Sequence, residues 1–175
     1  LRAPDQVGLV DERGELTFGE LERRSNALAR GLRDLGVAEG GSVAVLCRNH
    51  RGFVEATIAV AKLGADLLYL NTAFAAPQLT EVVGREKHKA IVYDEEFGDL
   101  LSDAAKRRKR FIAWHDSDDL PYPTIGVLIA GGDPSDVVPP EREGRATILT
   151  SGTTGSPKGA SRANPQSLEP VVSLL

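Results

Sequence analysis

Glycine, hydroxyl and lysine residues are concentrated in one ten-residue stretch near the C-terminal end of the sequence. Residues 150–159 read Thr-Ser-Gly-Thr-Thr-Gly-Ser-Pro-Lys-Gly, and they directly follow residues 146–149, a short apolar segment that is typical of a buried strand. Glycine lets main-chain N–H groups converge on an anion, hydroxyls add hydrogen-bond donors, and a lysine adds a compact positive charge. A strand followed by such a loop predicts a phosphate-binding site.

The spacing of this stretch is not that of a P-loop kinase or GTPase, whose loop reads Gly-x-x-x-x-Gly-Lys-Ser/Thr. Here a proline precedes Lys158, and Gly159 stands where that loop has its metal-binding hydroxyl. The alternative to a phosphate site is a glycine-rich surface turn with a solvated lysine. We favour the phosphate site because the neighbouring motifs agree with it.

Strands and helices alternate in the sequence upstream of this stretch. The expected strands are near-continuous apolar runs, which favours an α/β fold with a mostly parallel sheet flanked by helices on both faces. Thr17 and Glu20 form an expected capping box for the first helix, and Asn49 is the expected cap of the second. We expect a hairpin from residues 7–10 and 15–16, strands at 43–47, 67–70, 90–93, 110–114 and 146–149, and helices at 51–63, from Pro77, at 95–105, around 124–130 and from about Pro165. Residues 116–145, rich in proline and charge, are expected to form a mobile connection.

Residues 150–159 resemble the phosphate loop of the adenylate-forming superfamily, which comprises acyl- and aryl-CoA synthetases, luciferases and the adenylation domains of peptide synthetases. The loop of that superfamily reads Thr/Ser-Ser-Gly-Thr-Thr-Gly-x-Pro-Lys-Gly, and this sequence matches it at every fixed position. Residues 17–21, 36–44 and 61–71 resemble further runs of these synthetases. Gly41 and Thr72 depart from those runs, which have aspartate and proline there, but both lie far in sequence from the loop.

This resemblance implies a two-step reaction. A carboxylate attacks the α-phosphate of MgATP to give an acyl-adenylate and pyrophosphate, and a thiol, usually coenzyme A, then displaces AMP. The resemblance gives Lys158 a catalytic role in stabilising the charge of the leaving pyrophosphate and places Thr150 at the Mg²⁺ ion. It assigns ATP binding to Thr150, Ser151, Gly152, Thr153, Thr154, Gly155, Lys158 and Gly159.

The expected substrate is a carboxylic acid, with a long-chain fatty acid as the first choice. A fatty acyl-AMP ligase or a carrier-protein loading domain is the alternative within adenylation chemistry. A further alternative is a non-catalytic piece of the fold that self-associates through apolar surface and forms dimers.

Both ends of the 175-residue sequence look cut, because it contains no methionine and stops within an apolar run. We therefore expect residues 1–175 to be an N-terminal fragment of the AMP-binding domain of an acyl-CoA synthetase, one that lacks the C-terminal domain with its catalytic lysine and is inactive alone.

Composition narrows the partners of the chain. The net charge of −4 disfavours nucleic acid. The sequence has neither a signal region nor the ~20 consecutive apolar residues that span a bilayer, so we expect a cytoplasmic location. The basic run Lys106–Arg110 is interpreted as a solvated helix end, with peripheral contact to anionic lipid as the alternative.

Cysteine and histidine give no sign of a metal site in the sequence. Cys47 lies in the apolar run 43–47, so a buried structural thiol is expected. His50, His88 and His115 are scattered, and we expect them to be surface or hydrogen-bonded residues. Trp114 is expected to pack in the core, with a place in a ligand-binding wall as the alternative.

Overall fold

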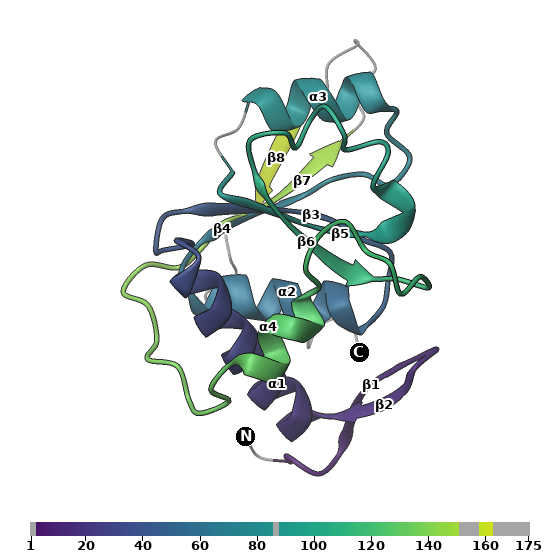
Figure 1. Cartoon of the computed structure of the whole chain (residues 1–175). Helices are drawn as coiled ribbons and strands as arrows, with labels where there is room; N and C mark the ends of the chain where they lie inside the picture. The colour runs from purple at the N-terminus through teal and green to yellow at the C-terminus, as the bar shows by residue number, and fades with distance from the viewer. Residues whose placement is uncertain (1–2, 86–87, 151–157, 163–175) are drawn as a thin grey trace, which may run out of the picture.

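Alternating strands and helices form three layers, with a sheet between two layers of helices (Figure 1). The computed structural model describes residues 3–85, 88–150 and 158–162, and for Thr150 and residues 158–162 it gives strand pairing only. The strands are β1 (Val7–Asp11), β2 (Gly14–Thr17), β3 (Ser42–Leu46), β4 (Asp66–Tyr69), β5 (Ala90–Asp94), β6 (Lys109–Trp114), β7 (Ala146–Thr150) and β8 (Lys158–Arg162). The α-helices are α1 (Phe18–Asp34), α2 (Arg51–Lys62), α3 (Ala76–Arg85) and α4 (Ile125–Gly131), and η1 (Glu95–Phe97) is a 3₁₀ turn.

The central sheet has the strand order β6-β5-β3-β4-β7-β8. The first five strands are parallel, and β8 runs antiparallel to β7. The chain passes from β3 to β4 on one side and then returns to place β5 on the other side of β3. In parallel sheets of this kind, ligands bind beyond the carboxyl ends of strands where the order reverses. The carboxyl edge between β3 and β5 is therefore a candidate ligand-binding site.

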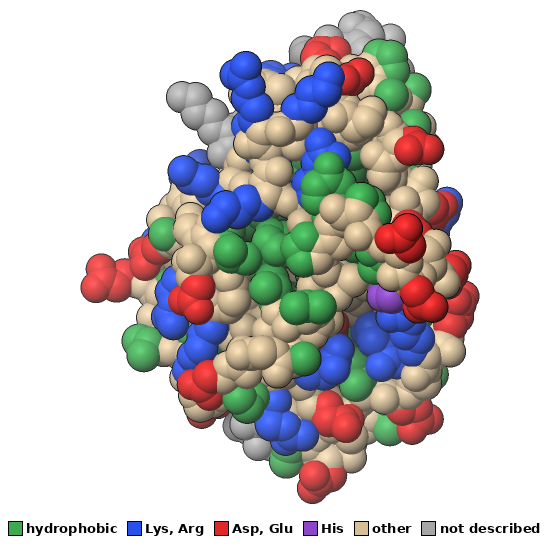
Figure 2. Space-filling view, in the orientation of Figure 1, with side chains coloured by type: hydrophobic (Ala, Val, Ile, Leu, Met, Phe, Trp, Pro, Cys, Tyr) green, Lys and Arg blue, Asp and Glu red, His purple; other side chains and the backbone are tan. Residues whose placement is uncertain are grey.

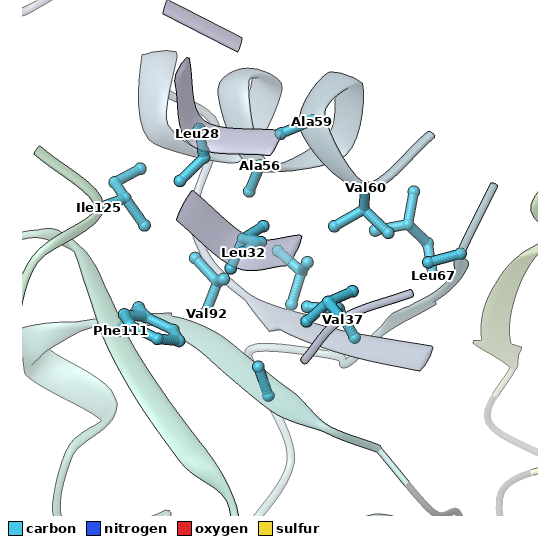
Figure 3. Packing of buried hydrophobic residues seen from close by; sticks show 14 of the residues in the cluster. Leu28, Leu32, Val37, Ala56, Ala59, Val60, Leu67, Val92, Phe111 and Ile125 are labelled. Atoms are coloured by element: carbon cyan, nitrogen blue, oxygen red, sulfur yellow. The ribbon is translucent and has the colours of Figure 1, made fainter. Parts of the chain in front are cut away.

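Both faces of β3, β4 and β5 are largely buried, which explains why these strands are apolar at nearly every position. Val43 and Val45 point toward α1 and α2, while Ala44 and Leu46 point toward α3. Figure 3 shows the first of these two cores, where side chains from α1 and α2 meet Val92 and Phe111 of the sheet. The predicted α/β fold with helices on both faces is confirmed.

At the start of α1 and α2, a side chain accepts a hydrogen bond from a main-chain N–H group that has no partner within the helix. Thr17 accepts a hydrogen bond from Glu20 N at 3.1 Å, and the Glu20 carboxylate accepts one from Thr17 N at 2.8 Å, so the predicted capping box of α1 is present. The predicted cap of α2 was wrong by one residue. His50 has the extended N-cap conformation, and its Nδ1 accepts a hydrogen bond from Gly52 N at 3.1 Å.

Two sequence predictions of secondary structure differ from the structure. Residues 95–105 were expected to form a helix, but only η1 is helical, and the turns after it bond to acceptors three or four residues back in no regular series. Strand β8 was not expected, because Lys158–Arg162 lacks alternating apolar residues. The helix expected from about Pro165 lies outside the described residues.

The segment 116–145 contains α4 and is joined to α1 and β4 by polar contacts. Arg30 of α1 donates hydrogen bonds to main-chain oxygens of residues 133, 135 and 136. Arg142 donates to Asp66 Oδ1 at 2.7 Å and to the Gly64 carbonyl at 2.9 Å. The mobility expected of this segment stays a prediction.

Candidate functional site

The two ends of the predicted phosphate loop are held side by side by strand pairing. Thr150, the last residue of β7, is the pairing partner of Lys158, the first residue of β8, and Leu149 pairs with Gly159. Partners in an antiparallel pair have Cα atoms about 4.5–5.5 Å apart. Thr150 and Lys158 therefore lie side by side at the carboxyl edge of the parallel strands.

Most residues assigned to ATP lie outside the described residues. These are Ser151, Gly152, Thr153, Thr154 and Gly155, so their role stays a prediction. The structure brings Thr150, Lys158 and Gly159 together as strand residues, although all three were predicted to lie in a loop. Pairing uses main-chain groups and leaves their predicted roles toward phosphate untested.

The position of β7 in the sheet is set by Asp66 at the start of β4. Its Oδ1 accepts hydrogen bonds from Arg145 N at 2.8 Å and from Arg142 Nη2 at 2.7 Å, and Leu67 N donates to the Arg145 carbonyl at 2.8 Å. These bonds join the residues just before β7 to the first residues of β4. The parallel register that follows pairs Leu67 with Ala146.

A second feature of the carboxyl edge is a cavity of about 940 Å³ beyond β3, β5 and β6, which we call the carboxyl-edge pocket. It lies at the strand-order reversal identified above. Its lining comes from the ends of those three strands and the residues that follow them, from the β1–β2 hairpin and from Thr72, three residues after the end of β4. The lining residues that matter here are Cys47, Arg48, His50, Asp94, Glu95, Glu96, Trp114 and His115.

Asp94 organises the floor of the carboxyl-edge pocket. Its Oδ2 accepts a hydrogen bond from Arg48 N at 2.7 Å, and its Oδ1 lies 2.9 Å from His50 Nε2. Because His50 Nδ1 accepts from Gly52 N, the proton of a neutral imidazole lies on Nε2 and is donated to Asp94. Both side chains are nearly buried, at 5% exposure for Asp94 and 8% for His50.

Cys47 lies beside this pair at the end of β3. Its residue is 9% exposed, and its Sγ lies 3.8 Å from the Val92 carbonyl oxygen, as expected for a buried thiol. Burial, reinforced by the Asp94 carboxylate, holds the pKa of the Cys47 thiol well above its usual range. The thiol is therefore protonated at neutral pH.

The β1–β2 hairpin closes one side of the pocket. Asp11 accepts from Arg51 N at 2.8 Å and from Arg51 Nη2 at 2.6 Å. This guanidinium holds the pKa of the Asp11 carboxyl far below its usual range. Arg13 stacks 3.9 Å from the centroid of Trp114, whose other ring contact is His50 at 4.8 Å between centroids. Trp114 also lines the pocket, and its alternative interpretation as part of a ligand-binding wall stays a prediction.

The predicted basic run Lys106–Arg110 is partly used within the chain. Lys109 donates to the Leu35 carbonyl, and Arg110 donates to the Ala105 carbonyl and stacks on Tyr122. Figure 2 shows acidic side chains interspersed with basic ones on the face it views. None of the helices described is both long enough and apolar enough to cross a membrane. Lipid contact and dimerisation stay predictions.

Comparison with known proteins shows which family the chain belongs to. Residues 1–169 match the sequence model of the AMP-binding enzymes. The chain belongs to the AMP-binding enzyme family. The adenylate-forming resemblance drawn from residues 150–159 is thereby confirmed.

The relatives of this AMP-binding chain are considerably longer than the chain itself. A medium/long-chain-fatty-acid–CoA/3-oxocholest-4-en-26-oate–CoA ligase of Mycobacterium marinum is 30% identical over 169 residues, which cover 89% of this chain and 31% of that ligase. Bacitracin synthase 3 of Bacillus licheniformis is 28% identical over 159 residues, which cover 90% of this chain and 2% of the synthase. This AMP-binding chain thus spans about a third of the length of the first of these relatives.

The fold of this AMP-binding chain also matches solved structures. An anthranilate CoA ligase in complex with anthranoyl-AMP superposes with a TM-score of 0.84 at 21% identity, over 93% of this chain and 32% of the ligase. At that identity the likeness shows a shared fold. The α/β layers described above are therefore those of a CoA-ligase fold.

Proposed function

We propose that this AMP-binding chain is the N-terminal part of an ATP-dependent ligase that converts a long-chain fatty acid into an acyl-adenylate and then into an acyl-CoA thioester. The observation that carries the proposal is the complete Thr150–Gly159 motif in a chain of this family, anchored at the carboxyl edge by the pairing of Thr150 with Lys158. The 30% identity to a fatty-acid–CoA ligase supports the substrate class.

The chemistry assigns separate tasks to the residues of the motif. The hydroxyls of Ser151, Thr153 and Thr154 and the main-chain N–H groups of the glycines would bind the β- and γ-phosphates of ATP. Lys158 would stabilise the negative charge that develops on pyrophosphate as it leaves. Thr150 would lie at Mg²⁺, which neutralises phosphate charge when it is bound.

Antiparallel pairing suits Lys158 to that task. The main chain of Lys158 pairs with Thr150, the last residue of β7. A charge-assisted hydrogen bond contributes about 1.5–3 kcal/mol. If the bond forms mainly in the transition state, its loss slows adenylation by roughly ten- to a few-hundredfold.

The test is Lys158→Ala in the full-length enzyme, measured by ATP–pyrophosphate exchange in the presence of fatty acids of graded chain length and, separately, of aryl acids. Lys106→Ala serves as the matched control, because the Lys106 side chain is 70% exposed and pairs with Asp103 on the surface. We expect the exchange rate to fall only in Lys158→Ala. An unchanged rate would remove the catalytic role of Lys158, and exchange with aryl acids alone would replace the fatty-acid assignment.

A second candidate function differs in the acceptor of the acyl group. The 28% identity to bacitracin synthase 3 supports an adenylation domain that loads a carrier protein, and a fatty acyl-AMP ligase is the related alternative. A carrier-protein loading domain and a fatty acyl-AMP ligase both differ from a CoA ligase in the second step of the reaction. Release of AMP that depends on coenzyme A identifies a CoA ligase, whereas exchange without such release identifies the alternative.

A further inference from the structure

Three side chains with metal-binding atoms converge at the floor of the carboxyl-edge pocket. Cys47 Sγ, a ring nitrogen of His50 and a carboxylate oxygen of Asp94 all lie within 4.8 Å of one another. Cys47 and His50 are three residues apart in the turn between β3 and α2, and Asp94 ends the neighbouring strand β5. None of the three has a part in the proposed binding of ATP.

We propose that Cys47, His50 and Asp94 bind a divalent ion of the Zn²⁺ class. The donor set of one sulfur, one imidazole nitrogen and one carboxylate oxygen is of the type that Zn²⁺ accepts in four-coordinate sites. The pocket lies beside the cluster and leaves room for a fourth ligand from solvent. Three protein ligands with one open position distinguish such a site from a closed structural one.

The geometry is close to what a tetrahedral ion requires. With bonds of about 2.0 Å to nitrogen and oxygen and about 2.3 Å to sulfur, the ligand atoms of such an ion lie roughly 3.3–3.6 Å apart. In the chain the His50–Asp94 contact is 2.9 Å and the largest separation in the cluster is within 4.8 Å. Small rotations of Cys47 and His50 therefore suffice, and the backbone of β3 and β5 can stay in place.

The surrounding charges favour a cation at this position. Glu95 and Glu96 follow Asp94 directly in the pocket wall, and Glu12 and Asp116 also line it. Arg48 is the one arginine or lysine among the described lining residues, and its guanidinium is paired with Glu96 at 2.5 Å. Of the arginines next to the lining, Arg51 is paired with Asp11 and Arg13 stacks on Trp114. Arg48 N donates to Asp94 Oδ2, which leaves Oδ1 for the ion and fixes the orientation of the carboxylate.

Binding requires defined proton movements. The Cys47 thiol releases one proton to solvent, because the thiolate is the ligand. The His50 Nε2 proton moves to Nδ1, so the imidazole stays neutral while Nε2 binds the ion. Nδ1–H can then no longer accept the hydrogen bond that Gly52 N donates to it in this structure. Metal binding should therefore disturb the first turn of α2.

The experiment is titration of the intact chain with Zn²⁺ against a chelator and with Co²⁺ as a spectroscopic substitute. We expect one ion per chain, a thiolate-to-cobalt charge-transfer absorption, and a change in the amide resonance of Gly52. Cys47→Ser should abolish the absorption and weaken Zn²⁺ binding at least about tenfold. Asp94→Asn, which keeps an acceptor for Arg48 N, should weaken binding by a similar factor.

His115→Gln is the matched control, because His115 lines the same pocket but lies outside the cluster. This variant should bind Zn²⁺ as the unmodified chain does. Absence of the charge-transfer absorption in the unmodified chain would overturn the proposal. Equal loss of binding in His115→Gln would also overturn it, because binding would then be non-specific. These readouts do not depend on adenylation, so they are independent of the proposed function.

Discussion

Replacing Asp11 by Asn tests how the β1–β2 hairpin is attached to the rest of the fold. Asp11 binds the main chain and the guanidinium of Arg51, and the two side chains are only 6% and 14% exposed. Removing one partner of a buried pair costs about 3–5 kcal/mol, and a single charge-assisted hydrogen bond contributes about 1.5–3 kcal/mol. Arg51 is near the surface and can regain water, so we expect a loss of about 2–3 kcal/mol.

This loss should be visible in thermal unfolding. For a chain of this size, 1 kcal/mol shifts Tm by about 2–4 °C, which gives a decrease of roughly 4–12 °C for Asp11→Asn. Glu12→Gln is the control, because Glu12 is the exposed neighbour on the same hairpin. Equal Tm values for the two variants would refute the view that the Asp11–Arg51 pair holds the hairpin in place.

The effect of Asp11→Asn on stability should also depend on pH. The Arg51 guanidinium lowers the pKa of Asp11 from its ordinary value of 3.8 in the folded chain. Because the folded-state pKa is the lower one, the ion pair stabilises the fold fully above about pH 3.8, and this contribution is lost as the pH falls toward the folded-state pKa. The difference in stability between the unmodified chain and Asp11→Asn should therefore shrink below pH 3.8 and stay constant above it.

Two further predictions concern the capping box and the pocket wall. Thr17→Ala removes the acceptor for Glu20 N and should lower the free energy of unfolding, measured by denaturant titration, by about 1 kcal/mol. Thr17→Ser keeps a hydroxyl acceptor and should lose much less. An unchanged free energy of unfolding in Thr17→Ala would contradict the capping role. Arg13→Ala exposes the face of Trp114, the sole tryptophan of the sequence, and should shift its fluorescence while costing about 0.5–1 kcal/mol. An emission spectrum identical to that of the unmodified chain would show that Arg13 does not cover the ring in solution.

Local sequence patterns predicted those parts of the fold that local interactions determine. The capping box of Thr17 and Glu20 was predicted correctly because its two bonds join residues three apart. The strands β3, β4 and β5 were recognisable because both of their faces are covered, so nearly every position is apolar. Helical spacing misled for residues 95–105, where Leu101 and Ala105 are buried although no continuous helix forms around them.

The parts that could not be predicted depend on contacts between distant residues. Strand β8 forms by main-chain pairing with β7, and main-chain pairing alone leaves no pattern in the sequence of Lys158–Arg162. Cys47 and His50 are three residues apart, but that spacing alone does not indicate a metal site. Asp94 joins them because β3 pairs with β5 in parallel, a relation that neither segment reveals alone.

The two bonds that Asp66 makes to the arginines ahead of β7 have a consequence for the glycine-rich motif. Side chains alternate across a strand, so sliding β7 by one position would send Leu149 out of the α3 core and turn its exposed neighbour Ile148 inward. Asp66 opposes that slide by binding Arg142 and Arg145 at the strand's entrance. The bonds that Asp66 makes ahead of β7 therefore determine the point at which the chain leaves the sheet after Thr150, at the other end of the same strand.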